Sequence, residues 1–394
     1  MRNYSAIFVA FGAVAFVAAI ALGDFPLVAG GQPVLPDYLA HWTGGRMLLD
    51  GHAADLFDPA VQTALQHRLV GSDGLSWFVS PPYTAWLYLP LALLPYGASA
   101  VVWLVLVAAL LALAFAWTRR LAVGRLRDGW SLFVLAFCAS PGVFEALGSG
   151  QDSILALVLW VAGLRLLLGG RDLGAGAVLA LGIFKPQLFV LVPVLLVAQR
   201  RWRALAGFAG VSGAIVVVSV LVDGLASWQG WVGALTSPLY TQEVQSGQLW
   251  KMQSLSALLE VFVPGGVVGF VALVAGALGL LVLGRQPGDR LERDWSVLAL
   301  VTVVTSPHVV LYDVVLLLPA LVWVFSHLDW RAVRGPVLAM FVLQWCIPLL
   351  HVLALQVGSD VVDAPWAAVP LTVLLLRVWR SRHRDPVPVP SLTH

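Results

Sequence analysis

Side chains that could take part in chemistry stand at a few breaks between long apolar runs of this sequence. The candidates are Asp37, His41, Arg46, Gln151, Asp152, Lys185, His308 and Asp313. An ionisable group at membrane depth is costly, so each one is a candidate functional residue by default. In the membrane threading given below they all fall on one side. We therefore expect one site that faces outward at membrane depth, which suits a substrate whose head group is carried by a lipid.

Three of these side chains also have an ordinary explanation as helix caps. Asp37 could cap a helix that follows Pro36, but Ala40 offers no reciprocal partner at the capping-box position. Gln151 and Asp152 could cap a helix that starts at the next residue. For these two, the sequence leaves the cap and the site role equally open.

The cationic candidates have structural alternatives as well. Lys185 could extend its ammonium to the membrane interface, although a Lys-Pro step inside an apolar run has no packing reason. His308 could bond to a carbonyl at a helix end. Arg46 could form an i, i+4 ion pair with Asp50.

The composition shows that these residues belong to a membrane protein. Of the 394 residues, 60% are hydrophobic and only 11% are charged, whereas soluble domains carry roughly 45–50% and about 25%. This excludes a disordered chain, a secreted disulfide scaffold and an ordinary soluble enzyme. The net charge of +2 is too small to indicate a nucleic-acid partner. Cys138 and Cys346 lie in apolar runs without CxxC spacing, so we expect them to pack in the core.

The apolar runs predict about twelve transmembrane helices, because about 20 apolar residues cross the hydrocarbon layer. The full-length runs are residues 5–23, 97–118, 130–148, 151–169, 203–222, 264–284, 310–327, 335–355 and 364–380, and the shorter ones are 173–185, 187–199 and 295–306. The first run is interpreted as an uncleaved signal anchor. The proline-rich run 81–94 is interpreted as a re-entrant or kinked segment.

The positive charges predict the orientation, because cytoplasmic loops are enriched in Lys and Arg. With both termini cytoplasmic, 19 of the 23 basic residues fall inside. The outer side keeps Arg46, Arg68, Lys185 and Lys251. We expect a multi-pass protein of the cell membrane with its site on the outer face.

We expect a single polytopic domain over residues 1–380, followed by a loose cytoplasmic tail at 381–394. The first outer loop, 24–80, is predicted to carry short surface helices. One covers Tyr38 to Leu49, and another starts at Asp58-Pro59, where Asp is a good N-cap and Pro suits the first helical position. The second outer loop, 223–254, is rich in Trp, Gln, Ser and Gly.

Short motifs in a fixed order give the chain a family resemblance. They are Asp37-Tyr38 with Gly44, Leu48, Leu49 and Gly51; Leu56-Phe57-Asp58-Pro59; Phe78-Val79-Ser80-Pro81-Pro82; Leu89-Pro90-Leu91 and Leu94-Pro95; Gly150-Gln151; Lys185-Pro186; and Ser306-Pro307-His308. Over about residues 35–330 this order resembles glycosyltransferase family 87. The chain departs from the family where an aromatic residue often stands four positions after the aspartate, because His41 occupies that position.

The resemblance implies an all-α integral membrane enzyme of the GT-C type. Such enzymes move a hexose, here expected to be mannose, from a polyprenyl-phosphate donor to a hydroxyl of a lipid or glycan acceptor on the outer face, with inversion. By position Asp37 resembles the general base, and Lys185 and His308 are expected to hold the phosphate. Gln151, Arg46 and His41 complete the expected substrate-binding set. The partners expected are this donor, the acceptor and membrane lipids, with no nucleic acid, no cofactor and no metal.

Two other functions compete with this interpretation. A lipid or glycan transporter or flippase needs polar groups along a path between the two faces, whereas here they cluster outside. A polysaccharide polymerase or ligase that uses polyprenyl-linked glycans usually carries paired arginines in a large, late outer loop. Here the outer loops hold only Lys251 after residue 200.

Overall fold

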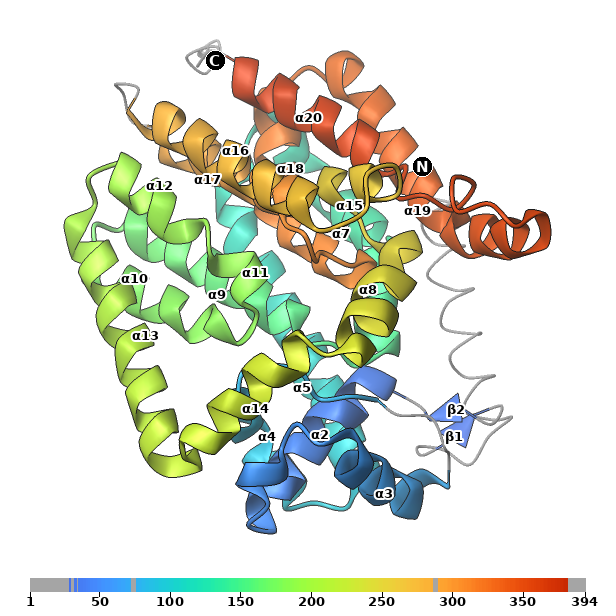
Figure 1. The fold of residues 1–394 in the computed structure, drawn as a ribbon. Helices are drawn as coiled ribbons and strands as arrows, with labels where there is room; N and C mark the ends of the chain where they lie inside the picture. Colours follow the sequence, from blue (N-terminus) through green and yellow to red (C-terminus); the bar gives the residue numbers. More distant parts are fainter. Residues whose placement is uncertain (1–27, 30–31, 34, 72–75, 286–289, 382–394) are drawn as a thin grey trace, which may run out of the picture.

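The computed structural model describes residues 28–29, 32–33, 35–71, 76–285 and 290–381. In these residues the chain is almost entirely helical (Figure 1). The described strands are β1 (Val28–Ala29) and β2 (Gln32–Pro33), which pair antiparallel. The expected first span, 5–23, and nearly all of the expected tail lie outside the described residues.

Four described helices are long and apolar enough to cross a membrane. They are α5 (Tyr96–Thr118), extended by η2 (Arg119–Leu121), α13 (Trp202–Asp223), α16 (Val267–Gly284) and α19 (Trp330–Val357). The pair α7 (Trp130–Cys138) and α8 (Pro141–Gly148) makes a fifth if it is one span, bent by 55°. Large apolar side chains such as Leu221, Phe270 and Leu355 are exposed on these helices. A membrane surrounding the helices would bury them, so the chain is a helical membrane protein.

Shorter apolar helices follow the other runs in the sequence. They are α9 (Ser153–Leu168), α10 (Asp172–Ala180), η3 (Leu181–Phe184), α11 (Pro186–Phe189), α12 (Val192–Ala198), α17 (Leu291–Thr305), η6 (Leu311–Leu317), α18 (Leu318–His327) and α20 (Ala368–Arg380). A further short helix, α6 (Gly124–Asp128), precedes α7. Because several of these helices are shorter than a full crossing, the total of twelve spans stays a prediction.

The middle of the molecule is built around α9 and α17, whose side chains are largely buried. Trp160 of α9 packs edge-on against Trp295 of α17, with ring centroids 5.2 Å apart. Phe189 of α11 packs on the same tryptophan at 6.0 Å. This apolar packing fixes α9, α11 and α17 relative to one another.

The first outer loop forms α2 (Pro36–Leu49), η1 (Ala53–Asp55) and α3 (Pro59–Val70), and the proline-rich run 81–94 forms α4 (Thr84–Ala92). The predicted cap of α3 is confirmed, because Asp58 accepts hydrogen bonds from Ala60 N at 2.8 Å and Val61 N at 3.4 Å. At nine residues, α4 is too short to cross a membrane.

In contrast to the expected surface helix, α2 is mostly buried. It packs closely on α4 (Figure 1). A Cβ at Gly45 would lie 3.0 Å from the backbone of Tyr88, so the small residue permits this close approach. The first outer loop therefore contributes buried side chains to the interior of the protein.

The expected second outer loop, 223–254, runs along the side of the helical bundle that faces α2 and α4 (Figure 1). It contains α14 (Leu225–Leu235), the π-helix η4 (Leu239–Gln245) and η5 (Ser246–Lys251), and α15 (Leu255–Glu260) follows it. Trp231 Nε1 donates to Val79 O at 3.0 Å, which joins α14 to the first outer loop. An isolated bridge between Met252 and Val310 joins the end of η5 to the segment between α17 and η6.

Candidate active site

A buried lysine lies at the centre of the polar residues. Lys185, between η3 and α11, places Nζ 2.8 Å from Ser153 Oγ and 2.9 Å from Gln151 Oε1. Asp152 Oδ1 and Asp313 Oδ1 each lie 3.1 Å away. The side chains of Lys185, Asp152 and Asp313 are 8%, 0% and 1% exposed. Its three N–H donors therefore face four oxygen atoms, and one ammonium is shared by two carboxylates.

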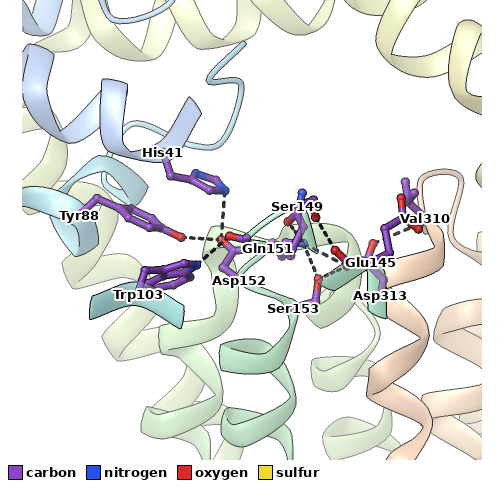
Figure 2. Close-up of polar contacts among 12 residues, drawn as sticks. His41, Tyr88, Trp103, Glu145, Ser149, Gln151, Asp152, Ser153, Val310 and Asp313 are labelled. Atoms are coloured by element: carbon purple, nitrogen blue, oxygen red, sulfur yellow. Dashed lines mark hydrogen bonds and ion pairs between the residues drawn. The ribbon is translucent and has the colours of Figure 1, made fainter. Parts of the chain in front are cut away.

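Asp313 joins the start of η6 to the start of α9. Its Oδ1 accepts a hydrogen bond from Ser153 Oγ at 2.7 Å, and its Oδ2 accepts one from Val310 N at 3.2 Å. Figure 2 shows Ser153, Asp313 and Val310 in this arrangement. The Lys185 ammonium also lies 4.7 Å from the ring centroid of Tyr312. Asp313 is thus a fixed part of the cluster.

Asp152 connects the lysine to α2 and α4. Tyr88 OH of α4 donates to Asp152 Oδ2 at 3.4 Å, and His41 Nε2 of α2 lies 3.6 Å from the same oxygen (Figure 2). The rings of His41 and Tyr88 are stacked, with centroids 4.7 Å apart. Burial lowers the pKa of His41, and the attraction of Asp152 opposes this only in part. His41 is therefore neutral at pH 7.

A turn before α9 holds Asp37 beside this cluster. Ser149 O accepts hydrogen bonds from Asp37 N at 3.0 Å and Tyr38 N at 3.1 Å. The next residue, Gly150, has φ +75, and a Cβ there would lie 2.6 Å from the Cβ of Tyr38. Trp103 Nε1 donates to Gly150 O at 2.8 Å. Glycine is required at this turn because both its conformation and its close neighbour exclude a side chain.

Asp37 itself is only partly buried, in the first turn of α2. Its carboxylate makes no hydrogen bond or ion pair with any described residue, and it does not cap the helix. Its charge nevertheless lies close enough to affect the pKa of His41. In contrast to Asp152 and Asp313, Asp37 therefore has a carboxylate without a partner among the described residues.

His308 lies on the segment between α17 and η6. Its Nδ1 lies 3.0 Å from Gln245 Oε1 of η4, and Gln245 Nε2 donates to Pro307 O at 3.0 Å. Burial lowers the pKa of His308 to about 4, with Asp313 opposing and nearby lysines reinforcing the shift. Because the amide oxygen Oε1 can only accept, His308 Nδ1–H is the donor, and the neutral ring presents an unprotonated Nε2 that can accept a hydrogen bond.

The structure brings some of the expected site residues together and leaves one apart. His41, Gln151 and Lys185 share one cluster, which Asp37 borders, and His308 lies on the segment that leads to Asp313. Arg46 forms the expected pair with Asp50, at 3.0 and 2.8 Å, with side chains 41% and 38% exposed.

Sequence reasoning missed three members of the cluster. Tyr88 and Tyr312 carried no signal, because tyrosines near a membrane are common as interface anchors. Ser153 directly follows Asp152, and its position at the start of an apolar run was the available hint.

Comparison with known proteins gives one family match. The sequence model of glycosyltransferase family 87 matches residues 78–307, which is more than half of the chain. The match includes Gln151, Asp152 and Lys185. No curated protein and no solved structure matches the chain.

Proposed function

Because the chain belongs to glycosyltransferase family 87 and is therefore a glycosyltransferase, we propose that it transfers a hexose from a polyprenyl-phosphate donor. Mannose is the expected sugar, and the acceptor is a hydroxyl of a lipid or glycan on the outer face. Helices that can cross a membrane support a lipid-carried donor. The arginines that follow α5, Arg119 and Arg120, support the proposed orientation, in which this end is cytoplasmic.

The proposed reaction is a single displacement at the anomeric carbon. The acceptor oxygen attacks this carbon while Asp37 takes its proton, and the bond from the carbon to the phosphate oxygen breaks. The electron pair of that bond leaves with the phosphate, so the sugar is transferred with inversion. The observation that carries this proposal is the free carboxylate of Asp37 beside a cluster whose other carboxylates are bound to Lys185. A general base must be unoccupied to accept a proton.

We propose different roles for Lys185 and His308. Lys185 was expected to hold the phosphate, but its four oxygen neighbours support a positioning role, in which it fixes Gln151 and Asp152 beside Asp37. His308 was also expected to hold the phosphate, but its unprotonated Nε2 can only accept a hydrogen bond, which suits a hydroxyl of the sugar or the acceptor. His41 and Gln151 remain candidates for binding the sugar or the acceptor.

The test compares sugar transfer by membranes that contain wild-type protein, Asp37→Asn or Asp55→Asn. Asp55 is an exposed carboxylate in the same loop, so it serves as the matched control. Loss of a general base lowers the rate by about 10²–10⁴-fold. We expect this loss for Asp37→Asn alone, with labelled polyprenyl-phosphate mannose as donor. Wild-type rates in Asp37→Asn would remove Asp37 from the mechanism.

A further inference from the structure

The departing phosphate needs a positive charge that the central cluster does not supply. Lys185 carries one positive charge, and its partners Asp152 and Asp313 carry two negative charges. His41 and His308 are neutral, because burial lowers both pKa values. The cluster therefore has an excess of negative charge, and a cation from elsewhere is needed to attract a phosphate.

The outer side offers few cations. Of the four that the threading places there, Arg46 is paired with Asp50, and exposed Arg68 donates to Ala64 O at 3.2 Å. Lys185 is surrounded by its own acceptors. Lys251 is different, because its partly buried ammonium makes no ion pair or hydrogen bond within the described part of the chain. It lies 5.8 Å from the ring centroid of the neighbouring Trp250.

The backbone fixes Lys251 beside the segment that carries His308. Met252, the next residue, forms an antiparallel bridge with Val310, and Gln253 N donates to Val309 O at 2.9 Å. The same outer loop contributes Gln245, which binds His308. The positive charge of Lys251 also contributes to lowering the pKa of His308.

We propose that Lys251 binds the phosphate of the polyprenyl donor with its ammonium, beside the segment that carries His308. This assignment rests on the proposed function, because it requires a donor whose leaving group is a phosphate. When the bond to the sugar breaks, the phosphate gains the electron pair and one unit of negative charge. The attraction to Lys251 increases at this step, so the residue stabilises the transition state more than the bound donor.

The composition provides a direct test in the wild-type protein, because Lys185 and Lys251 are the two lysines of the chain. An amine-reactive reagent followed by peptide mass spectrometry should label Lys251, whereas the buried Lys185 stays unlabelled in folded protein. Farnesyl phosphate should protect Lys251 from labelling. Farnesol and inorganic phosphate at the same concentration should protect it much less, which separates a lipid phosphate from the lipid chain or the free anion. Equal labelling with and without farnesyl phosphate would overturn the proposal.

Variants provide the second test. A hydrogen bond to a charged group contributes about 1.5–3 kcal/mol, so Lys251→Gln should weaken farnesyl phosphate binding about 10-fold or more, whereas Lys251→Arg should retain most of it. Arg68→Gln, which removes another outer cation, should bind like wild type. Wild-type affinity in Lys251→Gln, in a protein that transfers sugar, would overturn the role of Lys251 and leave the transferase proposal intact. A wild-type protein that neither transfers from polyprenyl-phosphate mannose nor binds farnesyl phosphate would overturn both.

Discussion

Replacing Lys185 by methionine should destabilise the protein strongly. Lys185→Met keeps an unbranched side chain of similar length but removes the ammonium, so Asp152 and Asp313 remain buried and face the same space without a cation. Removing one partner of a buried ion pair costs about 3–5 kcal/mol. The two carboxylates here share one ammonium, so we expect a value in the upper part of that range.

The charge count predicts an asymmetry between the partners. Asp313→Asn leaves Lys185 and Asp152 as a pair with no net charge. It should therefore lower the free energy of unfolding less than Lys185→Met does. The double variant should be more stable than the sum of the two single losses by about 0.5–3 kcal/mol, which is the usual coupling between residues in contact.

Denaturant titration of each purified variant in detergent micelles measures its free energy of unfolding, and the comparison with wild type gives these differences. The control is Arg201→Gln, which breaks a partly exposed pair with Asp172 at a similar distance of 3.0 Å and should cost about 1 kcal/mol or less. A Lys185→Met protein as stable as the Arg201→Gln protein, or single effects that simply add, would refute the reasoning.

Two further predictions concern His308 and Arg46. The pKa of His308 is about 4 in the folded protein and about 6.5 in an unfolded chain. As the pH falls, the unfolded state therefore binds the proton first, and this residue should lower the free energy of unfolding by about 1–2 kcal/mol between pH 7 and pH 5. Unfolding of wild type and His308→Gln at both pH values checks this. An equal loss of stability in the two proteins would contradict it. Because the Arg46–Asp50 pair is exposed, Arg46→Gln should change the free energy of unfolding by about 0.5 kcal/mol or less. The rate of sugar transfer should stay unchanged. A clear loss of transfer would show that Arg46 belongs to the substrate-binding site.

Most helices could be predicted from the sequence, because a membrane demands long apolar segments and the composition shows them directly. The expected runs 97–118, 203–222 and 264–284 agree closely with α5, α13 and α16. The bend between α7 and α8 was not predicted, because the run 130–148 was interpreted as one span although Pro141 lies inside it and starts α8.

The burial of α2 was not predicted, because its polar residues, among them Asp37, His41 and Arg46, favoured a surface helix. The contact that buries it depends on Gly45 and on the position of α4, which are tertiary features.

The candidate site could be predicted by residue type but not by partner. Lys185, Asp152 and Asp313 were all recognised as costly groups at apolar borders. Their mutual pairing joins positions that are far apart in the sequence, and nothing local specifies it. The sequence therefore indicated which charged residues belong to the site, whereas the structure shows that Asp152 and Asp313 neutralise the charge of Lys185.

The order of these charges along the chain has a consequence for synthesis in the membrane. Asp152 and Lys185 are made first and form a neutral pair, so neither needs to enter the membrane as an isolated ion. Asp313 is made much later, and it meets Ser153 Oγ, which was made with Asp152, and its own neighbour Val310 N as hydrogen-bond donors. The cluster can therefore close in two stages, each of which adds a charged group only when a partner is ready to receive it.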